Sequence, residues 1–194
     1  MEERVVAPHA STPAGSALTS GGLGFMPSDL LEQTCKRVGV AALAFAAMWA
    51  WTLVMNNVVW RLFDAVPNHV GEWGTFSNPI ASIGLVISLG MVGIAGRLHH
   101  EPAKLLDVGL GFEVATAALV GALNWWAAMP NGTGVSWICV IIIFYPAIVP
   151  ASVRKILITS MIAASMDPRW FGLGHLRGVE YGLSPSELLW AFVP

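Results

Sequence analysis

The chain has 194 residues, of which 55% are hydrophobic and only 11% are charged. An average soluble domain carries about 25% charged residues, so this chain lacks the polar side chains that would cover a water-facing globule. Its net charge of −2 offers no basic surface to nucleic acid. Composition therefore predicts an integral membrane protein and excludes a nucleic-acid-binding module.

Residues 1–34 are rich in Ala, Ser, Gly, Thr and Pro and contain no apolar run long enough to span a bilayer. They begin with the acidic Met1-Glu2-Glu3, whereas a secretory signal needs a basic start and an apolar core. We expect an extended cytoplasmic arm that is disordered alone in water and is ordered by neighbouring protein chains.

Four apolar runs follow, each close to the roughly 20 residues that cross a hydrocarbon core. They lie at residues 38–60, 80–96, 105–129 and 137–153 and predict a four-helix transmembrane domain over residues 35–155. The fourth run contains Pro146 and Pro150, which would break a soluble helix but are tolerated as kinks inside a membrane.

The basic residues indicate how these helices are oriented. With four crossings, the arm, the second loop and the C-terminal tail share one side, and the other side holds only Arg61. An excess of Lys and Arg marks the cytoplasmic side, so both termini are predicted to lie inside a bacterial inner membrane. The cytoplasmic set is Arg4, Lys36, Arg37, Arg97, Lys104, Arg154, Lys155, Arg169 and Arg177.

Residues 156–194 are predicted to form a cytoplasmic interfacial helix and a tail. The run from Ile156 to Ser165 is apolar but too short to span, and Asp167-Pro168 closes it. It suits either an amphipathic helix on the inner surface or a bent cytoplasmic end of the fourth helix. The remaining tail ends in an apolar segment that resembles the start of a further hydrophobic element.

Glu113 is the one ionisable residue well within a predicted span. An intramembrane carboxylate marks a functional site by default, because a partner or a proton must offset its desolvation. A proton relay would need a second such group, and the spans contain none. We therefore expect Glu113 to make a hydrogen bond to a neighbouring helix or to a basic group near the inner surface.

Several polar and aromatic residues are expected at the outer ends of the helices. Tryptophans gather at membrane interfaces, so Trp125, Trp126 and Trp137, with Asn124, are predicted to pack helices together or to contact a partner. Asn56 and Asn57 have two alternatives: they bridge helices, or they face water.

The sequence contains no catalytic or metal-binding signature, and no activity of its own is expected. The phosphate-binding loop, zinc-protease and nucleophile-elbow motifs are all absent. No histidine lies within a span, which makes the chain a poor primary ligand for haem or chlorophyll. The cofactor expectation is therefore limited to peripheral contact with bacteriochlorophyll, carotenoid or lipid.

Three stretches, 109–119, 134–150 and 154–168, resemble the N-terminal multi-helix membrane region of certain bacterial serine/threonine protein kinases. The shared features are the Glu in the third span, Ser-Trp before the fourth, Phe-x-Pro-x-x-x-Pro around it and Ala-Ser-Met-Asp-Pro after it. The resemblance covers residues 38–190 and implies a cytoplasmic kinase domain beyond them. The chain departs from that family because its kinase motifs are absent, so it is either part of a longer protein or a region that serves without a catalytic half.

These observations predict a non-catalytic accessory or scaffold subunit that stabilises other integral subunits of a larger bacterial membrane complex. A photosynthetic reaction-centre and light-harvesting assembly is one specific candidate, because such kinases occur in lineages that include phototrophs. The nine tryptophans also suit contacts with pigment edges. The alternative is the membrane-anchoring sensory domain of a serine/threonine kinase, and a small transporter ranks last.

Overall fold

The computed structural model describes residues 28–59, 62, 70–126, 137–149 and 151–182, and within these residues the chain is all-helical. The predicted arm up to residue 27, the loop around Arg61 and the end of the tail lie outside the described residues. The helices are α1 (Ser28–Val54), the π-helix η1 (Met55–Val59), α3 (Val70–Arg97), the 3₁₀ turn η2 (Leu98–His100), α4 (Pro102–Trp125), α5 (Trp137–Ile148), α6 (Val153–Ala164) and α7 (Met166–Leu176).

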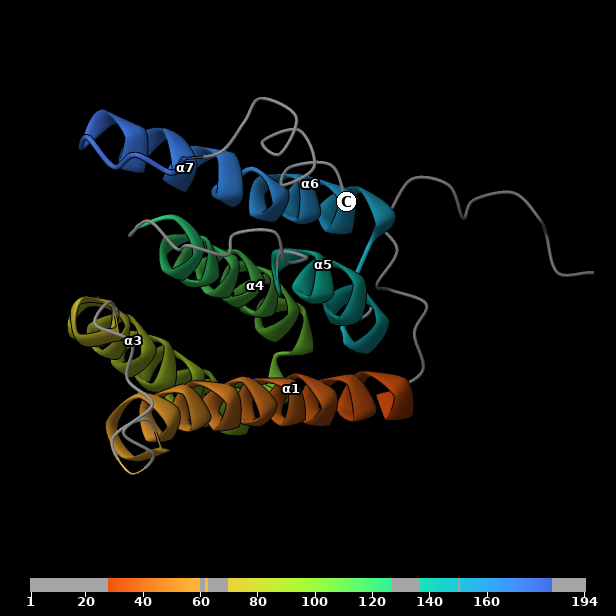
Figure 1. The fold of residues 1–194 in the computed structure, drawn as a ribbon. Coiled ribbons are helices and arrows are strands. Elements are labelled where there is room, and N and C mark those ends of the chain that lie inside the picture. The colour runs from red at the N-terminus through yellow and green to blue at the C-terminus, as the bar shows by residue number, and fades with distance from the viewer. Residues whose placement is uncertain (1–27, 60–61, 63–69, 127–136, 150, 183–194) are drawn as a thin grey trace, which may run out of the picture.

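Helix α4 lies at the centre of the bundle and packs against all of the other long helices (Figure 1). The hairpin of α1 and α3 covers one side of α4, and α5, α6 and α7 cover the other. Pro102 opens α4 at its first position, where its missing N–H costs nothing. The bundle has two ends, which we call the Arg97 end and the Trp125 end after the last residues of α3 and α4.

Two hydrophobic cores stack along the bundle, one toward each end. The core at the Arg97 end includes Val38, Met91, Leu105, Tyr145 and Val149. The core at the Trp125 end includes Trp49, Ile80, Ala117, Ile138 and Ala163. The core at the Arg97 end contains early residues of α1 and α4 and late residues of α3 together with the end of α5, and the other core contains the opposite ends. These four helices therefore alternate in direction, as consecutive crossings would.

Among the residues that the structure describes, three helices are long and apolar enough to cross a membrane by length and composition, and they cover Gln33–Val59, Phe76–Arg97 and Pro102–Trp125. They correspond to the first three predicted runs. The fourth run, residues 137–153, gives the 12-residue helix α5, which contains Pro146 and ends at Ile148. This helix is shorter than the roughly 20 residues of a full span.

Two helix starts differ from the expected boundaries. Helix α1 begins at Ser28, so residues 28–34 are helical rather than part of the arm. Helix α3 begins at Val70 and includes Pro79, within the stretch that was expected to be an outer loop. In the sequence, Gly, Asn and Pro favour a turn here, but the structure holds this helix through hydrogen bonds from Asn56 to Ser77 and Asn78.

Helices α6 and α7 pack along α4, an arrangement that neither predicted alternative for this segment included. Lys155 at the start of α6 pairs with Asp107 near the start of α4, whereas Trp170 in α7 lies against Gly121 and Asp167 bonds Trp125 near the end of α4. The pair therefore runs lengthwise along α4 in the same direction (Figure 1). The interfacial helix was predicted from a short apolar run that ends at Asp-Pro. The sequence does not show that Asp167 and Trp170 have partners on α4.

Candidate functional site

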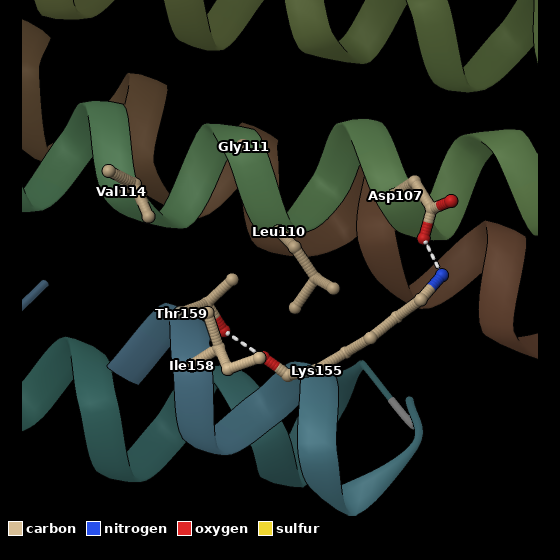
Figure 2. A pocket seen from close by; sticks show the side chains of 7 residues that line it. All are labelled: Asp107, Leu110, Gly111, Val114, Lys155, Ile158 and Thr159. Carbon is tan, nitrogen blue, oxygen red and sulfur yellow. Dashed lines mark hydrogen bonds and ion pairs between the residues drawn. The ribbon is translucent and has the colours of Figure 1, made fainter. Parts of the chain in front are cut away.

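An open groove of about 420 Å³ lies between α4 and α6 toward the Arg97 end (Figure 2). Its walls are mostly apolar, its two charged groups stand at one end, and the Thr159 hydroxyl lies toward the other end. Gly111 leaves space in the α4 wall, where a Cβ atom would meet nothing within 4 Å. The residues that line the groove are Asp107, Leu110, Gly111, Val114, Lys155, Ile158 and Thr159.

An ion pair stands at the end of the groove nearest the Arg97 end. The Lys155 ammonium reaches from α6 across to the Asp107 carboxylate on α4 (Figure 2). Both side chains remain about half exposed, at 47% and 57%. The pair therefore presents one positive and one negative group side by side to anything that enters the groove.

Glu113 lies beside this groove in the interior of α4. Its side chain is only 1% exposed, and neither carboxylate oxygen has a hydrogen-bond partner among the described residues. Thr159 and Tyr145 are its polar neighbours, but both hydroxyl groups donate to backbone carbonyls instead, Thr159 to Lys155 or Ile156 and Tyr145 to Gly109. Among the described residues Glu113 makes no ion pair, and the Thr159 hydroxyl is the neighbouring group on another helix that could donate to it.

The predicted contact residues Asn124 and Trp125 meet α7 at the Trp125 end. Trp125 Nε1 donates to the Asp167 carboxylate at 3.0 Å, and Asn124 Nδ2 donates to the same oxygen at 3.3 Å. Tyr181 donates its hydroxyl proton to the Trp125 carbonyl. Burial raises the pKa of Tyr181, so the hydroxyl stays protonated and keeps that bond at neutral pH.

Trp126 belongs to the same aromatic cluster, which we define as Phe76, Trp125, Trp126, Trp170, Phe171, His175 and Tyr181. It stacks on Phe76 with ring centroids 4.6 Å apart and planes 3° apart. The Arg177 guanidinium lies 3.6 Å from the centroid of the Trp126 ring, within the range of a cation–π interaction. Asn124, Trp125 and Trp126 therefore pack helices within this chain.

Trp137 and the two asparagines of η1, Asn56 and Asn57, have different outcomes. Trp137 is 59% exposed at the start of α5 and remains available to lipid or a partner. Asn56 and Asn57 bridge helices: Asn56 bonds Ser77 and Asn78, and Asn57 exchanges hydrogen bonds with Asn78 at 3.2 and 3.0 Å. Both asparagines therefore bridge helices, and Asn57 does so while remaining exposed.

Sequence reasoning missed the groove itself and the partner role of Asp167. Asp107 and Lys155 are 48 residues apart, and no local pattern pairs them. Glycine in a transmembrane helix favours close packing of a neighbouring helix, yet Gly111 faces open space. Asp167 was interpreted as a helix terminator, since Asp-Pro is a common turn signal.

Comparisons with protein-family models, with curated proteins and with solved structures find no match.

Proposed function

We propose that this chain is a non-catalytic accessory subunit that stabilises other integral subunits of a larger bacterial membrane complex. The observation that carries the proposal is the uncovered surface of α1 and α3. In their apolar segments only 28% and 33% of the residues are buried within the chain, against 61% in α4. A helix hairpin with this much free apolar surface supports a role in packing against other membrane helices.

The surface of α3 that faces away from the bundle suits such packing. We call it the open face of α3, and adding a Cβ atom at Gly90 or Gly93 would meet nothing within 4 Å. Small residues allow close approach of another helix, and the larger side chains beside them supply contact area. The open face consists of Ile83, Val86, Leu89, Gly90, Gly93 and Ile94.

The proposed topology places the Arg97 end on the cytoplasmic side. Helices α1, α3 and α4 serve as three full crossing segments, and the 12-residue α5 serves as a shorter fourth segment. Helices α6 and α7 then return along α4 toward the outer side. This moves Arg169 and Arg177 outward, so seven basic residues remain inside against three outside. That bias still supports a cytoplasmic N-terminus, but the C-terminal part is now proposed to lie outside.

A photosynthetic assembly is retained as the specific candidate complex. Trp51 and Trp137 are both more than half exposed and are positioned to contact lipid, carotenoid or bacteriochlorophyll edges. An absorption spectrum of the native complex tests this step. Bacteriochlorophyll or carotenoid bands support it, and their absence removes it.

The accessory role is tested by isolating the native complex and identifying its subunits and this chain's intact mass. Stable co-purification with other integral subunits at a mass near 20.7 kDa supports the role. A much larger mass with kinase peptides beyond Pro194 instead supports the alternative, the membrane-anchoring sensory domain of a serine/threonine kinase.

The open face is tested in the same preparation. Gly90→Leu should reduce co-purification of the partner subunits, because leucine fills the space that a neighbouring helix would occupy. Gly111→Leu is the matched control, since it places the same side chain in open space on α4. Equal co-purification of both variants and the unmodified chain would contradict a partner on this face.

A further inference from the structure

We propose that the groove between α4 and α6 is a phospholipid site that selects a zwitterionic headgroup with a primary ammonium, as in phosphatidylethanolamine. The acyl chain would lie along the apolar walls, and the headgroup would meet the ion pair at the groove's end. This inference concerns a lipid ligand of the chain itself and does not depend on which subunits it accompanies.

The position of the groove favours a lipid over a water-soluble ligand. Helix α4 is a membrane-compatible helix, and Asp107 is six residues into it. At 1.5 Å per residue, the lining from Asp107 to Val114 runs about 10 Å further along the helix. The polar groups thus stand near headgroup level, and Leu110, Val114 and Ile158 extend inward to acyl-chain depth.

The dimensions also suit one acyl chain and part of a headgroup. A volume of about 420 Å³ lies within the usual range of small-molecule sites. Gly111 deepens the α4 wall, because no atom of the described structure occupies the place of its missing side chain. Leu110 points toward α6 and forms an apolar side of the space (Figure 2).

Charge complementarity identifies the headgroup. Lys155 can pair with a lipid phosphate, and Asp107 can accept hydrogen bonds from a primary ammonium. Phosphatidylglycerol supplies the phosphate but brings only negative charge toward Asp107. Phosphatidylcholine carries the positive charge but has no N–H to donate. Of these three headgroups only ethanolamine satisfies both side chains, and it does so without the additional carboxylate of phosphatidylserine, which would be repelled by Asp107.

Glu113 adds a second polar feature beside the groove. Its unpartnered carboxyl is almost fully buried and neighbours Thr159, which lines the groove. A lipid that fills the groove would seal this side of α4 from water. The buried carboxyl and the open groove therefore lie on neighbouring parts of α4, with Thr159 between them.

The test measures lipid retained by the purified full-length chain, using native mass spectrometry after reconstitution with phosphatidylethanolamine, phosphatidylcholine or phosphatidylglycerol of identical acyl chains. We expect phosphatidylethanolamine adducts to exceed each of the others by about threefold, the scale of a half-exposed charge pair. Equal adduct levels for the three lipids would overturn the proposal. So would a preference for phosphatidylglycerol that persists in Asp107→Asn, because it indicates a simple anion site at Lys155.

Variants locate the binding. Gly111→Leu should abolish retention of all three lipids, and it raises helix propensity, so unfolding is not the expected cause. Gly90→Leu, on the open face of α3, should leave retention unchanged. Lys155→Gln and Asp107→Asn should keep acyl-chain binding but remove the headgroup preference. Unchanged retention in Gly111→Leu, with helicity preserved by circular dichroism, would show that the lipid binds elsewhere.

The lipid site and the accessory role fail independently. Loss of partner subunits in Gly90→Leu with lipid retained concerns the accessory role alone. Loss of lipid in Gly111→Leu with partner subunits retained concerns the groove alone.

Discussion

Glu113 is a single polar side chain in the most buried helix of the bundle, and its surroundings define what substitution should do. Both of its oxygens lack partners in the described structure, and its hydroxyl neighbours donate to backbone carbonyls. Glu113→Gln should therefore change the free energy of unfolding by less than about 1 kcal/mol, because no hydrogen bond or ion pair is removed. Thermal unfolding in detergent, followed by circular dichroism, measures it.

Glu113→Lys provides the contrast at the same position. It would bury an ammonium without a partner and should destabilise the helix bundle by about 2–3 kcal/mol. If Glu113→Gln proves as harmful as Glu113→Lys, then the carboxylate pairs with a group outside the described residues.

Asp167 has the opposite situation, since its carboxylate accepts from Trp125 and Asn124. Asp167→Ala should cost about 1–3 kcal/mol of stability, because it leaves the buried indole N–H without an acceptor. Asp167→Asn keeps an accepting oxygen and should cost less. Glu101→Gln, which touches only the exposed Glu101–Lys104 pair, should have no measurable effect. A similar melting temperature for all three variants would argue against a structural role for the Asp167–Trp125 bond.

At the scale of elements, the α1–α3 hairpin depends on a close approach at Gly84. A Cβ atom there would overlap the Trp49 ring, and an indole packed between helices has little room to move. Gly84→Ala should destabilise the protein by about 1–3 kcal/mol through overpacking. Gly90→Ala on the same helix meets open space and should be neutral or slightly stabilising. Equal unfolding curves for the two would show that the helices separate easily at this point.

Helix identity was predictable for most elements, but helix ends were not. The apolar runs at 38–60, 80–96 and 105–129 correspond to α1, α3 and α4, because a run of this length and composition has few other structures available in a membrane. The extension of α3 back to Val70 was not predictable from local signals. Within the part of this extension whose side chains are described, Ser77 and Asn78 accept hydrogen bonds from Asn56 in a different helix.

At the scale of the whole molecule, the direction of α6 and α7 determines where the C-terminal part lies. We expect Glu180→Cys and Lys104→Cys to face opposite sides of the membrane. Lys104 is near the start of α4, whereas Glu180 follows α7 and lies near the end of α4, where Tyr181 bonds Trp125. In a background with Cys35→Ala and Cys139→Ala, a membrane-impermeant maleimide applied to intact cells should label only Glu180→Cys. Permeabilised cells provide the control, in which both should react. Labelling of neither position in intact cells would restore the topology with both termini inside.

The sequence by itself determined the class of the molecule, an all-helical protein with long apolar helices compatible with membrane spans, whereas it predicted four spans and the described residues contain three such helices. Composition and run length are sums over many residues, so tertiary contacts do not easily override them. The sequence also identified Asn124, Trp125 and Trp126 as packing residues. That prediction rested on their position near a predicted helix end and did not name the residues that they contact.

Only the tertiary structure decided how the C-terminal helices pack and where the groove lies. Both depend on pairs far apart in the chain, such as Lys155 with Asp107 and Asp167 with Trp125. The hydrophobic pattern of residues 156–165 fits a helix on a membrane surface as well as a helix packed along another helix. The choice between them comes from specific hydrogen bonds and aromatic packing against α4, which exist only when the chain is folded.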